Sequence, residues 1–458
     1  MINIIMDNIS FSIPNNVIEI GETTTMKKTE VPNSNSNSNI RYFNSSLKSE
    51  SPLINTSTPS TTSMEFSRSP SPSGSGSLQN KPTICFATMC KNEEHCIQET
   101  LESVYKYIDT WVVCDTGSTD RTCEIVTEFF KEKNIPGTLY VDEWKGFDVN
   151  KTLLFDRCYK KAEYIMHVDA DDLLMEDFTF TRSDAGKISY LINVKRGSSV
   201  YKCLVLFNNY YKWRFCGVAH TTIKCLDNIH KLTEGDLSGR DYYVISRDTG
   251  ARSFDPEKYL KDAHRLTEQF FNTLLFDPDE LNGRSAFYAA QSYMDSGKWK
   301  EAANWYTLYT QLKNTWWNEE IFESHMRIAS CMIKMEYTDD QIVAQMQKAI
   351  DIFPDRAEPH YTMGKYFNDK SRCDIGYTYF KNAKKADIVS VNKKYRLFVN
   401  PMVYGKYIND ELSVACYWTD RAEEGITLLE EILSDPEFDD RKERLLKNRE
   451  HFTNKYNI

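Results

Sequence analysis

The sequence predicts an α/β domain with a mostly parallel sheet, followed by an all-α domain of repeated helical hairpins. Two observations support this prediction. Apolar strands alternate with amphipathic helices between residues 81 and 255, and the strand pattern then gives way to aromatic residues at helical spacing. With 458 residues, 41% of them hydrophobic, the chain is long enough for two or three domains with substantial cores.

The first 80 residues differ from the rest of the chain in composition. Between residues 31 and 80, 32 of the 50 positions are Ser, Thr, Asn or Pro, which leaves too little apolar surface to offset the entropy of ordering this segment. We therefore expect a disordered low-complexity tail. The expected divisions are a tail at 1–80, an α/β domain at 81–255, a helical domain at 256–440 and a charged helix or tail at 441–458.

The α/β pattern consists of short apolar runs, each followed by a polar turn or an amphipathic helix. The expected strands are residues 83–90, 111–114, 138–144 and 163–168, and the expected helices are residues 97–108 and 121–134. Ser118 or Thr119 is the expected cap of the second helix. Parallel sheets bind ligands beyond the carboxyl ends of their strands, so the polar residues after each strand are candidates for a site.

The strongest candidate is the acidic run Asp169, Asp171 and Asp172, which directly follows an apolar strand. Three neighbouring carboxylates repel one another, and a divalent cation relieves this repulsion. Hard oxygen ligands suit Mg²⁺ or Mn²⁺, which keep open positions for substrate phosphates. The alternative is a solvated acidic turn that caps the next helix.

Three residues near the ends of the first two strands are weaker candidates for a nucleotide pocket. Asp115 has the chemistry to accept hydrogen bonds from a base or ribose, and its alternative role is an N-cap or Asx-turn. Thr88 and Glu94 stand where the first strand ends, in position to line the same pocket. Glu94 has an alternative role too, because an acidic residue favours a helix N-terminus.

The helical part repeats itself. The spacing of a 34-residue helix-turn-helix repeat is met by Ala290, Tyr293, Ala302, Tyr306 and Tyr309, with Gly297 at the turn, and again by Gly364, Phe367, Gly376, Phe380 and Ala383. This pattern predicts a tetratricopeptide-like array whose concave surface binds a protein partner or shapes an acceptor site. Four tryptophans provide either sugar-stacking surfaces or core, namely Trp299, Trp305, Trp316 and Trp317.

Charge and composition exclude several classes of protein. A net charge of -10 disfavours nucleic acid as a partner. No apolar run is long enough to cross a bilayer and the N-terminus has no basic signal region, so we expect no transmembrane segment and a cytoplasmic location. The twelve cysteines form no CxxC pair and the eight histidines are scattered, which predicts reduced thiols and no structural zinc.

The order of the motifs resembles a known family. MCKNEE, VVCDTGSTD and HVDADD, each at the end of an expected strand, are similar to the nucleotide-sugar-binding half of family-2 glycosyltransferases, which have the Rossmann-like GT-A fold. Further along, DTGARSFDPEKYLKDAHRL, FYAAQSYMDSG, PDRAEPHY and ELSVACYW resemble a subgroup with a tetratricopeptide-like C-terminal half. The resemblance covers about residues 82–435.

The resemblance implies roles for the residues after the strands. It places the base of the donor against Asp115 and Thr88, and the ribose and metal-bound diphosphate against Asp169 and Asp171, with Asp172 as the second choice of ligand. It therefore implies a nucleotide-sugar donor and a divalent cation, Mn²⁺ or Mg²⁺.

Other motifs give further implied donor-site residues. Lys151, beside Asn150, stands where the family often has a basic residue near the donor, although both residues also suit a helix start. His220 resembles the family's Gly-x-x-His segment and is the second implied metal ligand, but Thr221 stands where an acid is usual. Arg252 has the chemistry to clamp a phosphate, and its alternative is an ion pair with a nearby Asp.

Because Thr221 stands where the family usually has an acid, the general base must be another acidic residue. Asp248 is the first choice, and Asp236 and Asp241 compete with it. The predicted function is metal-dependent, inverting transfer of a hexose, with a UDP-linked donor as first choice, to a hydroxyl of a glycan, protein or small molecule. The alternatives are a protein-binding module with an inactive transferase domain and a nucleotidyltransferase, although CKNEEHC is no phosphate loop.

Overall fold

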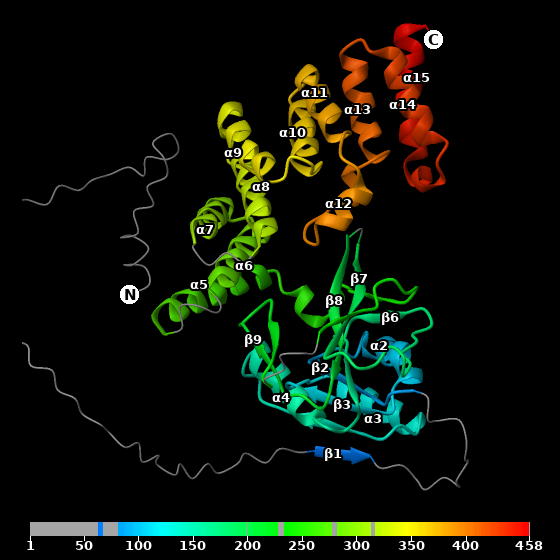
Figure 1. Cartoon of the computed structure of the whole chain (residues 1–458), viewed down its shortest axis with the longest axis vertical. Coiled ribbons are helices and arrows are strands. Elements are labelled where there is room, and N and C mark those ends of the chain that lie inside the picture. The colour runs from blue at the N-terminus through cyan, green and yellow to red at the C-terminus, as the bar shows by residue number, and fades with distance from the viewer. Residues whose placement is uncertain are drawn as a thin grey trace, which may run out of the picture. The chain divides into compact units, whose positions relative to one another are not determined.

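The computed structural model describes residues 63–66, 81–197, 199–227, 233–276, 282–312 and 317–457. A ten-stranded sheet with helices on both faces forms the N-terminal half of this part of the chain, and helices alone form the C-terminal half (Figure 1). The predicted fold class is confirmed.

The centre of the sheet is parallel, as expected. The four parallel strands lie in the order β4-β3-β2-β5 and are β2 (Ile84–Cys90), β3 (Thr110–Asp115), β4 (Gly137–Val141) and β5 (Tyr164–His167). Beyond β5 the sheet continues with β8 (Ser199–Asn208), β7 (Ser189–Arg196), β12 (Tyr243–Ile245) and β6 (Leu173–Met175), and β11 (Gly235–Asp236) pairs with β7. Because β8 is antiparallel to both β5 and β7, the strands β5, β7 and β12 all point the same way.

Alternating side chains on the strands form a separate core on each face of the sheet. On β2, Ile84 and Phe86 face α2 (Ile97–Val104) and α3 (Thr122–Glu132), whereas Cys85 and Ala87 face α4 (Phe147–Cys158). The two-stranded sheet of β9 (Trp213–Cys216) and β10 (Thr222–Cys225) packs beside α4. Fully buried parallel strands explain why the sequence shows continuous apolar runs here.

One part of the predicted tail is a strand. β1 (Ser63–Phe66) pairs antiparallel with β4, so the expectation of disorder throughout 1–80 is wrong for these four residues. The physical reason is that β4 is the last parallel strand on this side, and its unpaired edge offers backbone groups for a further strand. The rest of that prediction concerns residues 1–62 and 67–80, which lie outside the described part of the chain.

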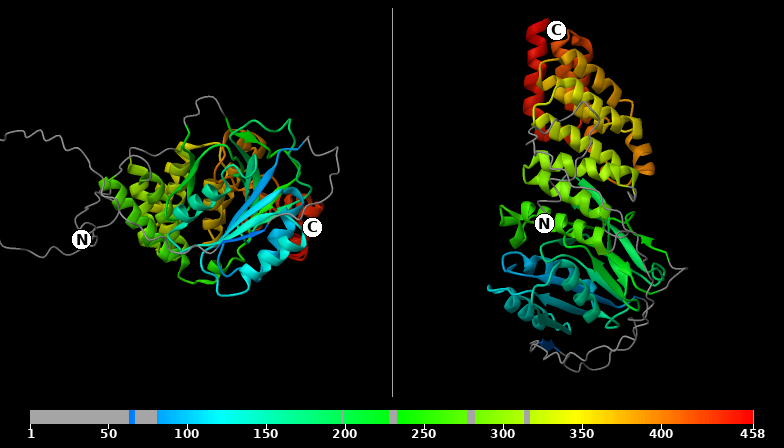
Figure 2. Two further views of the ribbon diagram at one scale, coloured as in Figure 1. Left: turned by 90° about the horizontal axis from the view of Figure 1, so that it is seen from below. Right: turned by 90° about the vertical axis from the view of Figure 1, so that its left-hand side faces the viewer.

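The helical half consists of antiparallel pairs that follow one another in chain order (Figures 1 and 2). Its helices are α5 (Lys258–Phe276), α6 (Asn282–Asp295), α7 (Trp299–Gln311), α8 (Asn318–Lys334), α9 (Asp339–Ile352), α10 (Glu358–Asp369), α11 (Cys373–Ala383), α12 (Ile388–Lys394), α13 (Tyr407–Trp418), α14 (Ala422–Leu433) and α15 (Lys442–Tyr456). Short 3₁₀ turns precede the helical half, η2 (Tyr105–Tyr107) and η3 (Ala251–Phe254). Others lie within it, η4 (Pro401–Val403) and η5 (Pro436–Arg441).

Two glycines of the helical repeats, Gly297 and Gly364, have the roles that the repeat pattern predicts. Gly297 turns the chain between α6 and α7 with a φ of 74°, a conformation that favours glycine. At Gly364 a Cβ atom would lie 2.7 Å from the ring of Phe380, so this glycine lets α10 and α11 pack closely. Of the tryptophans, Trp305 is buried and Trp317 is 43% exposed.

Two expectations about the whole chain can be compared with the described residues. Among these residues, no helix combines the length and the apolar character needed to span a membrane. The twelve cysteines all lie in the described part of the chain and form no disulfide there, and eight of them are buried.

Candidate functional site

The loops after β2 and β3 are joined by hydrogen bonds into one structure at the carboxyl edge of the sheet. Asn92 links them twice, because its N–H donates to the Ser118 hydroxyl at 2.8 Å and its side-chain oxygen accepts the N–H of Thr119 at 2.8 Å. The N–H of Glu93 donates to the Thr122 hydroxyl at 2.8 Å. The predicted neighbouring motifs therefore meet, and each holds the other in place.

Asp115 lies at the end of β3 and is 1% exposed. Its carboxylate accepts the N–H groups of Gly117 at 3.0 Å and Ser118 at 2.9 Å, and also the Ser118 hydroxyl. This is the Asx-turn that was the alternative reading. Thr88 is fully buried, and its hydroxyl has no hydrogen-bond partner among the described residues. Contact of either residue with a nucleotide stays a prediction.

Glu94 binds the backbone at the start of α3 rather than at the start of the helix that follows it, α2. Its carboxylate accepts the N–H of Arg121 at 2.9 Å. The cap expected at Ser118 or Thr119 is wrong, since Asp120 accepts the N–H of Thr122 at 3.0 Å. Both of the expected capping residues are instead used to join the two loops.

Lys151 and Asp169, two predicted site residues, lie in contact. The ammonium of Lys151 on α4 is 2.9 Å from the Asp169 carboxylate, which follows β5. The charge of Lys151 lowers the pKa of Asp169 to about 2. Asn150 holds the start of α4 in place, because its side chain accepts the N–H of Lys145 at 2.8 Å and donates to the Glu143 carbonyl at 3.0 Å.

Asp171 and Asp172 bind the backbone of a segment that is distant in sequence, residues 246–251. Asp171 accepts the N–H of Gly250 at 2.9 Å, and Asp172 accepts the N–H of Arg247 at 3.0 Å. Burial, together with the charge of Asp169, raises the pKa of Asp171 and raises that of Asp172 to about 7. Both carboxyl groups are therefore protonated more readily in the folded chain than in water.

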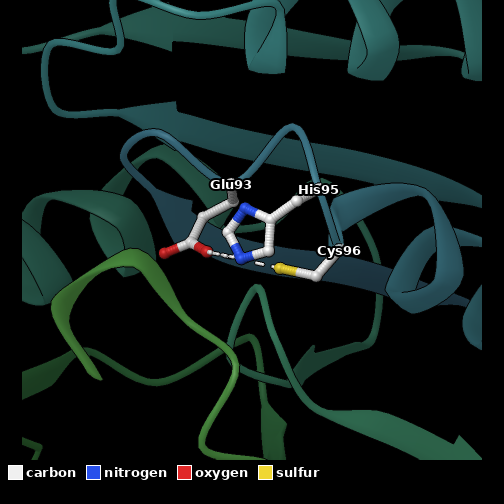
Figure 3. Close-up of side chains that lie close together, drawn as sticks. All are labelled: Glu93, His95 and Cys96. Carbon is white, nitrogen blue, oxygen red and sulfur yellow. Dashed lines mark hydrogen bonds and ion pairs between the residues drawn. The ribbon is translucent and has the colours of Figure 1, made fainter. Parts of the chain in front are cut away.

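The same segment is held by the loop after β2. The N–H of Ala251 lies 3.1 and 3.2 Å from the two carboxylate oxygens of Glu93, and the Nε2 atom of His95 is 2.6 Å from the Thr249 carbonyl. Glu93, His95 and Cys96 point toward one another, and their ligand atoms all lie within 4.8 Å of each other (Figure 3). Burial raises the pKa of Glu93 and raises that of Cys96 to about 12.

This cluster was not identified from the sequence. The available signal was the presence of three types of metal-ligating side chain within four residues, Glu93, His95 and Cys96. A search for paired cysteines and spaced histidines overlooks such a group.

His220 and Arg252 contact the helical half. The ring of His220 stacks on Tyr288 of α6 with centroids 4.2 Å apart, and the carbonyl of His220 accepts from Arg284 at 2.9 Å. Arg252 forms an ion pair with Asp262 of α5, which was its alternative reading. Among the residues that the structure describes, no group of three converging ligand atoms includes either Asp171 or His220.

The three candidate bases lie at different places in the sheet. Asp248 follows β12, so it belongs to the carboxyl edge, and its side chain pairs with Arg196 at the end of β7. Asp236 on β11 is aligned with Leu191 near the start of β7 and pairs with Lys202 at 2.8 Å. Asp241 precedes β12. The topology favours Asp248, because the other two lie toward the opposite ends of these strands.

The chemistry of the carboxylates that follow β5 suits the divalent cation that the resemblance implies, although their ligand atoms do not converge as a group of three in the described residues. Asp169, Asp171 and Asp172 offer hard oxygen ligands, as Mg²⁺ and Mn²⁺ require. The raised pKa values of Asp171 and Asp172 reflect first their burial and then repulsion by Asp169, and a bound cation would offset both. The hydrogen bonds to the 246–251 segment use one oxygen of each carboxylate, Oδ2 of Asp171 and Oδ1 of Asp172.

Comparison with protein families identifies the α/β half. Residues 85–181 match the model of Glycosyl transferase family 2, and this segment includes β2 to β6 with all three clustered aspartates. Residues 85–181 thus resemble a family-2 glycosyltransferase domain. The predicted resemblance and the predicted class of enzyme are thereby confirmed. Among curated proteins, none matches this chain.

Several solved structures are similar to parts of the chain. MamA is 15% identical and covers 44% of this chain and 96% of its own, with a TM-score of 0.28. TarS 1–349 of S. aureus, solved in complex with UDP-GlcNAc, is 15% identical over 60% of this chain and 90% of its own, with a TM-score of 0.30. TTC0263 of Thermus thermophilus, a thermophilic TPR protein, is 13% identical over 42% and 98%, with a TM-score of 0.27. These TM-scores are too low to carry an inference for this chain.

Proposed function

We propose that the glycosyltransferase domain catalyses metal-dependent, inverting transfer of a sugar from a UDP-linked donor to an acceptor hydroxyl. The observation that carries this proposal is the set of three carboxylates, Asp169, Asp171 and Asp172, gathered at the carboxyl edge within the family segment. Their excess negative charge suits a site that a cation and a diphosphate enter together.

Different residues of the domain have different roles in donor binding. Asp171, with Asp169 and Asp172, would hold Mn²⁺ or Mg²⁺, and the ion when bound supplies positive charge that stabilises the departing diphosphate. Lys151 keeps Asp169 ionised and places a further positive charge beside the leaving group. Asp115 ends β3, and Thr88 lies two residues before the end of the neighbouring strand β2; the base of the donor would lie at this edge.

Inversion requires one base on the acceptor side. The acceptor hydroxyl attacks the anomeric carbon from the face opposite the leaving diphosphate, and a carboxylate takes its proton during the attack. Asp248 suits this role because it belongs to the 246–251 segment, which Asp171 and Asp172 hold by its backbone. Its pairing with Arg196 keeps the carboxylate oriented until the acceptor binds.

The donor site is tested by removing the charge of one carboxylate. Asp171→Asn should abolish Mn²⁺-dependent binding of UDP, measured by calorimetry, because an amide is a poor ligand for a hard cation. Asp156→Asn on α4 is the matched control, since the side chain of Asp156 is half exposed and its carboxylate is 3.4 Å from Lys212. Unchanged UDP affinity in Asp171→Asn would refute this assignment.

The base is tested separately. Asp248→Asn should lower turnover by about 10²- to 10⁴-fold while donor affinity is retained. Asp156→Asn serves as the control because the side chain of Asp156 is half exposed on α4. Normal turnover in Asp248→Asn would exclude Asp248 and move the search to Asp236 and Asp241.

A further variant tests whether His220 is the second metal ligand that the family resemblance implies. If it completes the coordination of the metal, His220→Ala should weaken Mn²⁺ binding and lower turnover together. If the ring only stacks on Tyr288, the same change should leave Mn²⁺ affinity unaltered.

A further inference from the structure

The loop between β2 and α2 brings three different metal-ligating side chains together: Glu93, His95 and Cys96 (Figure 3). The Cys96 sulfur is 3.3 Å from the Oε2 atom of Glu93, and the Nε2 atom of His95 is 4.0 Å from the same oxygen. These groups lie beside the donor site, yet none of them has a part in the proposed transfer reaction.

The spacing of these atoms is close to that around a tetrahedral zinc ion. Zn²⁺ holds sulfur at about 2.3 Å and nitrogen or oxygen at about 2.0–2.2 Å, which places neighbouring ligand atoms roughly 3.3–3.7 Å apart. The two separations to the Glu93 oxygen, 3.3 and 4.0 Å, bracket this range, and all the ligand atoms lie within 4.8 Å of each other. Small side-chain movements are therefore enough to close the site.

The types of ligand decide which cation binds. Sulfur and imidazole ligands select Zn²⁺ and similar ions, whereas Mg²⁺ and Mn²⁺ prefer oxygen alone. We propose that Glu93, His95 and Cys96 form a binding site for a thiophilic divalent cation, with Zn²⁺ as the expected occupant. On binding, the Cys96 thiol gives its proton to solvent and a sulfur–metal bond forms. The site is distinct from the carboxylate set and does not depend on the proposed function.

Two of these side chains also hold the 246–251 segment, so cation and segment compete. His95 uses Nε2 to donate to the Thr249 carbonyl at 2.6 Å, and Glu93 accepts the N–H of Ala251. A cation that takes Nε2 of His95 and one oxygen of Glu93 removes the first of these bonds and weakens the second. Because Asp248 lies in this segment, occupancy of the site alters the position of the proposed base.

Cobalt titration of the full-length protein tests the site directly. Co²⁺ replaces Zn²⁺ in such sites and gives a thiolate-to-cobalt charge-transfer absorption when sulfur is a ligand. One equivalent of Co²⁺ should produce this absorption, and Zn²⁺ should abolish it. Cys96→Ser should remove it, whereas Cys203→Ser, at an exposed cysteine of the same domain, should retain it. Absence of the absorption in the wild type, or its persistence in Cys96→Ser, would overturn the proposal.

A second variant and a second measurement keep the test decisive if Cys96→Ser does not fold. The side chain of His95 is 40% exposed, so His95→Ala should fold and should weaken Co²⁺ binding by at least about tenfold. Unchanged affinity there would also overturn the site. Zn²⁺ should speed amide hydrogen exchange at Ala251, and unchanged exchange would contradict the competition with the segment. Mn²⁺-dependent UDP binding is measured independently, so failure of either idea is recognised separately.

Discussion

The carboxyl edge of the sheet and the Arg356–Glu358 pair inside the helical half differ in how their buried charges are compensated. At the edge, Asp171 and Asp172 lie close to Asp169, and their carboxyl pKa values are raised. In the helical half, the guanidinium of Arg356 is 1% exposed and makes bonds of 2.8 and 2.9 Å to the two carboxylate oxygens of Glu358.

Both members of the Arg356–Glu358 pair make further hydrogen bonds. Arg356 also donates to the carbonyls of Leu397 and Phe398, at 3.2 and 2.7 Å, and Glu358 accepts the Tyr404 hydroxyl at 2.7 Å. This network joins the start of α10 to the chain that follows α12. The comparison teaches that the chain itself compensates the buried Arg356–Glu358 pair, whereas burial and the charge of Asp169 raise the pKa of Asp171 and Asp172, where a bound cation would supply the compensation.

The largest effect should come from breaking the balanced pair. Arg356→Ala leaves the Glu358 carboxylate buried and unpaired, which should cost about 3–5 kcal/mol of unfolding free energy. Arg449→Ala is the control, because Arg449 pairs with Glu430 at the surface at 3.1 Å and should cost at most about 1 kcal/mol. Denaturant unfolding measures both, and equal losses would show that the buried network is not special.

A smaller effect is expected where the edge is tightly packed. A Cβ atom at Gly250 would lie 2.7 Å from the Asp171 carboxylate, so Gly250→Ala must push that side chain away and break its bond to the backbone. We expect a loss of about 1–3 kcal/mol in stability, together with weaker Mn²⁺-dependent UDP binding.

Gly239→Ala provides the control for this change. A Cβ atom there meets no other atom within 4 Å, so stability and UDP binding should both be retained. If Gly250→Ala behaved like Gly239→Ala, the 246–251 segment would be free to move away from Asp171 at little cost.

The raised pKa of Asp172 at the carboxyl edge should make the stability of the folded chain depend on pH. The pKa of Asp172 is about 7 in the folded chain, well above its ordinary value near 4 when unfolded. The folded state therefore holds a proton that the unfolded state has lost between these two pH values, and stability falls as pH rises through this window. Asp172→Asn should flatten that decline and raise the melting temperature at pH 8, an effect on the order of 1 kcal/mol because the side chain is only partly buried.

Metal-free protein is needed for this measurement, and Asp156→Asn is again the control. An unchanged pH profile in Asp172→Asn would mean that the carboxylates at the edge are already balanced without a cation.

The sequence predicted the parts of the site that are local to one strand and its turn. Asp169, Asp171 and Asp172 were found because a buried strand ends directly before them, and Lys151 because of its motif. The contacts of the 246–251 segment were not predictable, since Gly250 meets Asp171 across 79 residues and Ala251 meets Glu93 across 158. Pairings of this kind depend on strand order, which the local pattern does not contain.

For Asp115, a local sequence pattern predicted the position of the residue but not its role. Its position at the end of a strand was predicted, but both its ligand role and its Asx-turn role were consistent with the same DTGS sequence. Only the bonds from Gly117 and Ser118 to its carboxylate establish that the turn exists.

The smallest effect concerns β1, the one described strand in the segment expected to be a tail. Deletion of residues 1–62 retains β1 and should leave the melting temperature unchanged. Deletion of residues 1–78 removes β1 and leaves the edge of β4 unpaired, so stability should fall by roughly 1 kcal/mol or less, because β1 is only four residues long. Calorimetric melting of the two truncated chains, compared with the full chain, measures the difference. Equal melting temperatures for both truncations would show that β4 needs no partner. UDP binding should be the same in both, since β1 pairs only with β4, at the far side of β3 from the carboxylate cluster.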